Sequence, residues 1–256
     1  MRLDHYLVAH GHCETRSKAQ DLIRRGLVTV DGFIETKTGR QVNTDSIKIN
    51  AASRFVGRGG EKLLQAILDF SLDFGGKIVI DIGSSTGGFT DCALQHGASL
   101  VHAYDVGTMQ MASPLRDDPR VHLREQTNIL DVTLPEADII TIDVSFTSVM
   151  PIITHCKDTE SDLVVLIKPQ FEAGPDHIKK GIVKDPKVRT RVLREVIGHA
   201  VTSGYALKGL TVSALSGKAG NTEYLCHLSK SGPSSDILQA IGDVSCSKNS
   251  TSKTSR

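Results

Sequence analysis

The feature that most restricts the fold of this chain is a strand, a glycine-rich turn and a helix in direct succession. Residues 78–80 form an apolar run with the character of a buried strand, and the sequence DIGSSTGGFT follows at 81–90. A helical apolar pattern then continues to His96 and Gly97. This succession begins a doubly wound α/β fold, in which glycines let the backbone approach a ligand at the carboxyl end of the first strand.

The spacing of the glycines narrows the choice of ligand. G-x-x-x-G-G differs from the G-x-G-x-x-G of dinucleotide-binding folds, which weighs against a nicotinamide cofactor. A second strand at 100–104 ends at Asp105, about 20 residues beyond the loop, where a carboxylate can accept hydrogen bonds from two ribose hydroxyls. The loop and Asp105 together resemble the S-adenosylmethionine site of class I methyltransferases.

Strand and helix signals continue to alternate, as an α/β sheet requires. Apolar strand patterns end at Asp143 and at Lys168, a helix over 189–203 stops at Gly204, and two late strands follow at 207–212 and 224–228. Beyond Lys230 the sequence is rich in Ser and Lys, and residues 230–256 are predicted to be a disordered tail.

The N-terminal segment has a different pattern and a different charge. Two short helices ending near Gly11 and Gly26 precede a hairpin with an Asp31-Gly32 turn and a further strand at 46–49. Residues 1–60 carry ten Lys and Arg against six Asp and Glu, whereas the remainder carries twenty against twenty-three. A basic small domain on a near-neutral protein suits an anchor for nucleic acid, although such a segment is also compatible with an ordinary solvated surface.

Residues 2–50 resemble the S4 RNA-binding domain, which grips structured RNA with a helix pair and a hairpin. A packing module of the same shape without RNA binding is the alternative. The resemblance implies that basic residues near the helices contact RNA, and the candidates are Arg2, Arg16, Lys18, Arg24 and Arg25. We predict an S4-like α+β domain over 1–50, a linker over 51–60, and a Rossmann-like class I methyltransferase domain over 61–229.

Four charged residues stand at the ends of elements that a sheet of this type brings to one edge. Lys62 opens the first helix of the second domain, Asp143 and Lys168 end two strands, and Glu223 begins the last strand. The spacing resembles the Lys-Asp-Lys-Glu tetrad of FtsJ-type ribose 2′-O-methyltransferases. Behind an S4 module, the segments RGGEKLL, DIGSSTGGFTD, IDVSF, IKPQFEAG and GNTEYL resemble the hemolysin A/TlyA family of ribosomal RNA 2′-O-methyltransferases over nearly all of residues 2–229.

The resemblance implies an activity, a cofactor and a set of site residues. The expected reaction is S-adenosylmethionine-dependent methylation of a cytidine ribose in ribosomal RNA, with Lys62, Asp143, Lys168 and Glu223 in the catalytic roles. The expected contacts to S-adenosyl-L-methionine are Asp81, Gly83, Ser85, Thr86, Gly87, Gly88, Phe89, Asp105 and Asn128. One loop departs from the family pattern, because Thr108 to Arg116 lacks its aromatics and its lysine; Met109 or Met111 is expected to replace the missing aromatic.

The chemistry explains the residue types. A ribose 2′-hydroxyl is a weak nucleophile, so an enzyme must align it with the methyl group and accept its proton. Lys168 is the candidate base, with Asp143 and Glu223 orienting the two lysines. Partial burial and the second lysine favour a neutral Lys168, whereas a close carboxylate favours its charged form. The alternative is that the four residues are ordinary surface ion-pair partners.

Other classes of function have less support in the sequence. No apolar run reaches the length of a membrane span, the N-terminus lacks the apolar core of a signal peptide, and a cytoplasmic protein is expected. The histidines His5, His10 and His12 are not accompanied by cysteines or carboxylates in a metal-binding pattern, so no metal is expected. A ribosome-assembly factor that binds cofactor and RNA without methyl transfer remains an alternative, and a cytolysin is a remote one.

Overall fold

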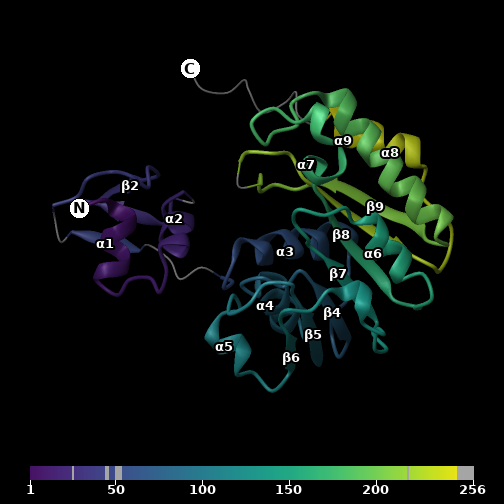
Figure 1. The fold of residues 1–256 in the computed structure, drawn as a ribbon, viewed down its shortest axis with the longest axis horizontal. Helices are drawn as coiled ribbons and strands as arrows, with labels where there is room; N and C mark the ends of the chain where they lie inside the picture. Colours follow the sequence, from purple (N-terminus) through teal and green to yellow (C-terminus); the bar gives the residue numbers. More distant parts are fainter. Residues whose placement is uncertain (25, 44–45, 50–53, 218, 247–256) are drawn as a thin grey trace. The chain divides into compact units, whose positions relative to one another are not determined.

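The computed structural model describes residues 1–24, 26–43, 46–49, 54–217 and 219–246. The chain divides into two compact units, residues 1–54 and 55–256 (Figure 1). The boundary lies inside the predicted linker, and the second unit begins earlier than the sequence suggested because Phe55 is buried in its core.

The first unit contains two helices and a small antiparallel sheet. Helices α1 (Leu3–Ala9) and α2 (Arg16–Arg24) precede the strands β1 (Val28–Val30), β2 (Phe33–Glu35) and β3 (Ile47–Ile49), which pair in the order β2-β1-β3. The hydroxyl of Thr15 accepts a hydrogen bond from the backbone N–H of Lys18, which caps the start of α2. Apolar side chains of both helices and of the sheet form one core.

The second unit is built on a seven-stranded sheet of order β6-β5-β4-β7-β8-β10-β9. The strands are β4 (Ile78–Ile82), β5 (Leu100–Tyr104), β6 (Val121–Arg124), β7 (Ile139–Ile142), β8 (Asp162–Ile167), β9 (Ala206–Val212) and β10 (Tyr224–Ser229). The first five strands along the chain are parallel, and β10 is antiparallel to both of its neighbours. This topology confirms the predicted Rossmann-like α/β fold.

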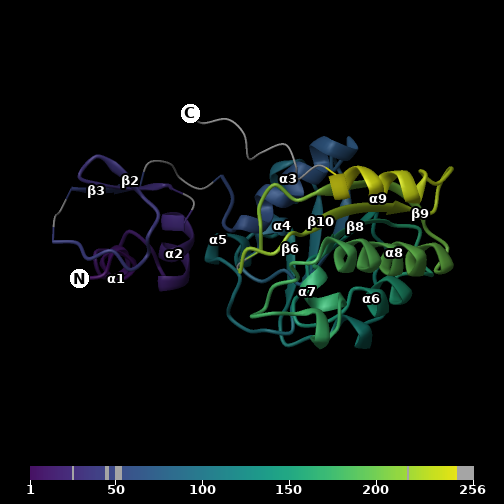
Figure 2. The same ribbon diagram turned by 90° about the horizontal axis from the view of Figure 1, so that it is seen from above.

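Helices cover both faces of this sheet. Helices α3 (Arg58–Phe70) and α4 (Gly88–Gln95) pack on one face, and α6 (Met150–His155) and α8 (Pro186–Thr202) pack on the other, as Figure 2 shows. Short helical turns, α5 (Ser113–Arg116), α7 (Pro169–Glu172), η1 (Ile129–Asp131) and η2 (Pro175–His177), connect the strands near the edge where β4, β5, β7 and β8 end. Because both faces are covered, the central strands β4, β7 and β8 are buried almost continuously, which explains their mostly apolar sequences.

The segment predicted to be a disordered tail contains an additional helix. Residues 237–246 form α9 (Ile237–Cys246), in which Ile241 and Val244 are buried beside α8 and β9. The prediction of disorder was wrong for this segment, because four apolar residues at helical spacing are enough to cover the edge of the sheet despite the Ser-rich surroundings. No helix in the described part of the chain has the length and apolar character needed to cross a membrane.

Candidate functional site

The topology brings the predicted catalytic residues to one edge of the sheet. Asp143 directly follows β7, and Lys168 directly follows the neighbouring strand β8. Tyr224 pairs with Ile167, so Glu223, which precedes the antiparallel strand β10, lies beside the end of β8. Lys62 lies in the second turn of α3, which packs against β10.

The four residues form two ion pairs. The Lys62 ammonium lies 2.5 Å from Oε2 of Glu223, and the Lys168 ammonium lies 2.6 Å from Oδ1 of Asp143. Lys62 and Lys168 are each 8% exposed and Glu223 is 3% exposed. Lysines and glutamates are seldom buried to this extent unless they are paired. The structure therefore favours a built polar site over the alternative of four surface residues.

Two further polar side chains belong to this cluster. The hydroxyl of Ser145 accepts a hydrogen bond from Lys168 at 3.0 Å, and the amide nitrogen of Gln170 donates to Oε1 of Glu223 at 3.1 Å. Gly217 lies so close to this carboxylate that an added Cβ would approach Oε1 to 2.4 Å. Sequence reasoning did not single out Ser145 or Gln170, although both lie in the segments IDVSF and IKPQFEAG.

Two aromatic side chains stand next to Lys168. Phe146 is 92% exposed and has a left-handed backbone conformation, with φ of 67°. Its ring centroid lies 5.3 Å from that of Phe171, and the Lys168 ammonium lies 5.9 Å from the centroid of the Phe171 ring. A phenylalanine so exposed, at a backbone conformation that costs free energy, is a common sign of a functional contact.

The glycine-rich loop after β4 has no room for side chains at its tight points. Gly83 has φ of 84°, and an added Cβ would lie 2.6 Å from the carbonyl oxygen of Asp143. Gly87 has φ of 89°, and its added Cβ would lie 2.4 Å from Leu115. Glycine is required at both positions, since other residues rarely adopt this conformation. The loop therefore presents backbone at the edge where a cofactor is expected.

Asp105 ends β5 and faces this loop. Its two carboxylate oxygens accept hydrogen bonds from the backbone N–H groups of Ser85 and Gly107, each at 2.7 Å. A carboxylate has about four acceptor positions, so about two remain for ribose hydroxyls. The hydroxyl of Ser84, which is buried in the same loop, has no hydrogen-bond partner among the described residues. These donors and acceptors fit S-adenosylmethionine.

Three predicted cofactor contacts lie beneath the loop. Asp81 is 1% exposed and accepts hydrogen bonds from the hydroxyls of Thr90 and Thr141 at 2.7 and 2.9 Å, while burial raises its pKa to about 6. Phe89 packs in the core, and Gly88 allows α4 to approach Gly60 of α3. The side chains of Asp81 and Phe89 contact protein here, and Gly88 lies against α3; all three stay predicted cofactor contacts.

The remaining predicted contacts, Ser85, Thr86 and Asn128, are exposed. Asn128 also caps η1, since its side chain accepts a hydrogen bond from the backbone N–H of Leu130. These three residues and Asp105 stay predicted contacts.

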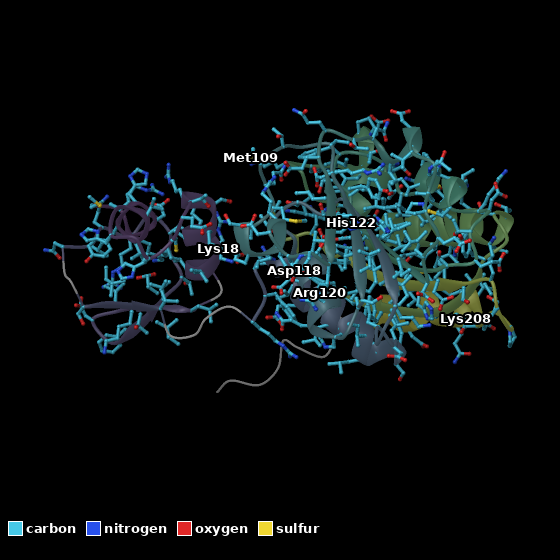
Figure 3. The ribbon with its side chains drawn as sticks, turned by 90° about the horizontal axis from the view of Figure 1, so that it is seen from below. Lys18, Met109, Asp118, Arg120, His122 and Lys208 are labelled. Atoms are coloured by element: carbon cyan, nitrogen blue, oxygen red, sulfur yellow. The ribbon has the colours of Figure 1, made fainter. Side chains whose placement is uncertain are left out.

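The loop that departs from the family pattern is held by Glu125. This carboxylate accepts hydrogen bonds from the backbone of Met109 and Gln110 and from Arg116, and these contacts lower its pKa to about 2. Met111 is buried near Gly87, whereas Met109 is 77% exposed and projects outward (Figure 3). Of the two methionines expected to replace an aromatic, Met111 is the one that packs in the core.

In the first unit, two of the predicted RNA contacts bind the same carboxylate. The guanidinium groups of Arg2 and Arg16 both bind the fully buried carboxylate of Asp4, at 3.0 and 2.9 Å. These bonds, led by the one from Arg2, hold the pKa of Asp4 well below its usual range. Lys18 is partly exposed and Arg24 is exposed on α2, and Arg25 lies outside the described residues.

Comparisons with known proteins agree with this architecture. A family model described as FtsJ-like methyltransferase matches residues 55–230, and one described as S4 domain matches residues 1–47. Hemolysin A of Brachyspira hyodysenteriae is 41% identical over 239 residues, which cover 89% of this chain and 99% of that protein.

Two further relatives extend the similarity. The protein named 16S/23S rRNA (cytidine-2′-O)-methyltransferase TlyA of Mycobacterium tuberculosis (strain ATCC 25618 / H37Rv) is 37% identical, with 89% of each chain covered. A solved structure described as a hemolysin from Streptococcus thermophilus has a TM-score of 0.77 and 38% identity, and covers 96% of this chain and 94% of that one. The chain therefore belongs to the FtsJ-like methyltransferase family, with an S4 domain ahead of its methyltransferase domain, and is a relative of the hemolysin A and TlyA proteins.

Proposed function

We propose that this protein transfers a methyl group from S-adenosylmethionine to the ribose 2′-hydroxyl of a cytidine in ribosomal RNA, and that it acts on ribosomal subunits in the cytoplasm. The observation that carries the proposal is the meeting of two lysine–carboxylate pairs, in which both lysines are buried, with a glycine loop and Asp105 at one edge of the sheet. The names of the TlyA relatives support cytidine in ribosomal RNA as the target.

The geometry of the loop supports Asp105 as the residue that holds the ribose of the cofactor. Asp105 has acceptor capacity for the ribose hydroxyls, and the left-handed conformations of Gly83 and Gly87 shape the loop whose Ser85 N–H binds that carboxylate. When it is bound, S-adenosylmethionine supplies a methyl group on a positively charged sulfur. Buried Met111 and Leu115 close the far side of the loop at Gly87.

The lysine pairs act on the 2′-hydroxyl. Lys168 donates a hydrogen bond to Ser145 and forms an ion pair with Asp143, so at least one of its three N–H donors is left to contact O2′. Negative charge grows on O2′ as its proton passes to a base, which is a neutral Lys168 in the general-base role or a water molecule if Lys168 only positions O2′, and the charge is consumed when O2′ bonds to the methyl carbon. Two ammonium groups fixed in a water-poor site stabilise that charge without having to reorganise. Asp143 and Glu223 position these ammonium groups.

The exposed ring of Phe146 suits the substrate base. Sequence-specific RNA recognition commonly uses unstacked bases that stack on aromatic side chains. Phe146 lies three residues after Asp143, and its ring packs against the ring of Phe171. The Phe171 ring lies next to the Lys168 ammonium. We infer that a base stacked on Phe146 keeps its own ribose near the lysine pairs.

The decisive experiment supplies purified protein with S-adenosylmethionine carrying a labelled methyl group, and with ribosomal subunits from cells that lack the gene. We expect the label in ribosomal RNA at a cytidine. The RNA chain should resist cleavage next to this cytidine, because the methyl group blocks its 2′-hydroxyl. Binding of cofactor and subunits without transfer would instead support the assembly-factor alternative. Lysis of membranes by the purified protein, with no RNA labelling, would support the cytolysin alternative.

A further inference from the structure

A tight hairpin carrying lysines lies between η2 and α8. Lys179 and Ile182 exchange both backbone hydrogen bonds, at 3.0 and 3.1 Å, around the central residues Lys180 and Gly181. These central residues have φ of 52° and 77°, as in the two-residue turns that join hairpin strands. Asn, Asp and Gly adopt this conformation more readily than lysine, so Lys180 is held in a costly conformation at the tip.

This hairpin is a basic region in an otherwise acidic domain. Residues 176–189 contain five Lys and Arg against two Asp, whereas the chain after residue 60 has an excess of three acidic residues. Lys179, Lys180 and Lys184 are exposed, and no ion pair with another described residue is found for any of them. Their charges are therefore available to a partner from solution.

The base of the hairpin is fixed to the protein. Asn221 is 3% exposed; its amide nitrogen donates to the carbonyl of Gly181 at 2.7 Å, and its oxygen accepts from the N–H of Val183 at 3.0 Å. The guanidinium of Arg189 donates to the carbonyls of Val183 and Lys184. Val183 itself is buried in the core. The lysines are consequently carried on a rigid support.

The support is continuous with the catalytic cluster. Asn221 lies two residues before Glu223, a separation of about 7 Å in extended chain. The carbonyl of Asn221 accepts from the N–H of Gly217, which lies against the Glu223 carboxylate. One short segment thus connects the lysine hairpin with the Lys62–Glu223 pair.

We propose that Lys179, Lys180 and Lys184 form a clamp for the phosphates of the RNA strand that carries the target ribose. The inference rests on the proposed function and adds a substrate-binding surface to it. A ribose in an RNA strand has a phosphate on each side, so a strand that presents its 2′-hydroxyl to Lys168 brings phosphates to the same edge. Lysines that contact phosphate supply affinity and register without reading sequence.

The test removes the three charges in the full-length protein by Lys179→Ala, Lys180→Ala and Lys184→Ala. Each lost phosphate contact lowers the slope of log affinity against log salt by about 0.7 to 0.9, so we expect the slope for ribosomal RNA to fall by about two to three. The KM for RNA should rise about tenfold or more. Single-turnover methyl transfer at saturating RNA and the affinity for S-adenosylmethionine should stay within about twofold, because the lysines do not touch the reacting atoms.

A matched triple variant removes the same charge from the opposite edge of the sheet. Lys77 precedes β4, Lys157 follows α6, and Lys208, labelled in Figure 3, lies near the start of β9. Replacing these three with Ala should leave the salt slope unchanged. The proposed clamp is overturned if the salt slope of RNA binding falls equally in both triple variants. It is also overturned if the slope is unchanged in the hairpin variant. If the wild-type protein transfers no methyl group, the proposed function fails, while the two slopes still decide whether the hairpin binds RNA.

Discussion

Lys168 is the residue whose role the contacts define most sharply, because Asp143 and Ser145 fix its ammonium group at the edge of the sheet. Lys168→Ala should lower single-turnover methyl transfer by about 100- to 10,000-fold, the usual contribution of a positioned acid–base group. Cofactor and RNA affinities should change by only a few-fold. Lys168→Arg separates two roles, since arginine keeps the charge but does not release a proton at accessible pH. If the Lys168→Arg variant is nearly inactive, Lys168 acts as a general base. If the variant keeps substantial activity and the wild-type pH dependence, Lys168 acts only through its positive charge, which positions O2′.

Gln170 donates a hydrogen bond to Glu223, and we predict that it acts through this carboxylate and not on the substrate. The carboxylate of Glu223 can only accept hydrogen bonds, so the amide nitrogen of Gln170 must face it. A hydrogen bond to a charged group contributes about 1.5 to 3 kcal/mol to stability. Gln170→Leu should therefore lower kcat by about tenfold or more and leave the KM values unchanged.

The control for this variant is Gln95→Leu, which removes a similar bond between Gln95 and Asp91 at the surface of α4. That variant should keep wild-type kcat. In a Glu223→Gln background, Gln170→Leu should have little further effect; a full additional loss there would mean that Gln170 does not work through Glu223.

At the scale of elements, Asp81 connects β4 with α4 and β7 through Thr90 and Thr141. Burial raises its pKa to about 6, whereas an unfolded Asp has a pKa of about 3.9. The folded state therefore binds more protons between these values, and stability must fall as pH rises through them. The free energy of unfolding should lose up to about 3 kcal/mol from this group between about pH 4 and about pH 7.

Asp81→Asn should remove this part of the pH dependence, so the variant gains stability relative to wild type as pH rises. Asp69→Asn, at an exposed carboxylate on α3, is the control and should follow the wild-type curve. Urea unfolding at several pH values measures both. Parallel curves for wild type and Asp81→Asn would show that burial does not perturb this carboxylate.

Strands β5, β7 and β8 could be predicted from the sequence because each is a mostly apolar run that is followed by a polar residue. That pattern located Asp105, Asp143 and Lys168. The pattern could not show which polar side chains form hydrogen bonds inside the protein. Asp81 was predicted as a cofactor contact, and only the structure shows that it accepts hydrogen bonds from Thr90 and Thr141. Arg2 and Arg16 stay predicted RNA contacts, and the sequence did not show that both also bind Asp4, which lies two residues after Arg2. Helix α9 was missed because Ser-rich composition hid its apolar spacing.

At the scale of the whole molecule, the two units have separate hydrophobic cores, and every residue of the proposed catalytic and cofactor sites lies in the second. RNA anchoring by the first unit should therefore be separable from cofactor binding by the second. The informative change is Lys18→Ala with Arg24→Ala, since neither side chain is among the hydrogen-bond partners of Asp4.

This double variant should lower the salt slope of RNA binding by about one to two and weaken RNA binding, because each lysine or arginine on a phosphate releases about one counterion. Titration calorimetry with S-adenosylmethionine should give the wild-type affinity. Arg16→Ala is the contrasting variant: it removes a partner of the buried Asp4 carboxylate, which costs about 1 to 3 kcal/mol, so it should lower the melting temperature of the first unit as well as its RNA affinity. A salt slope unaffected by Lys18→Ala with Arg24→Ala, in a protein that still binds RNA, would remove α2 from the RNA contact surface and leave the hairpin at 179–184 as the basic element to test.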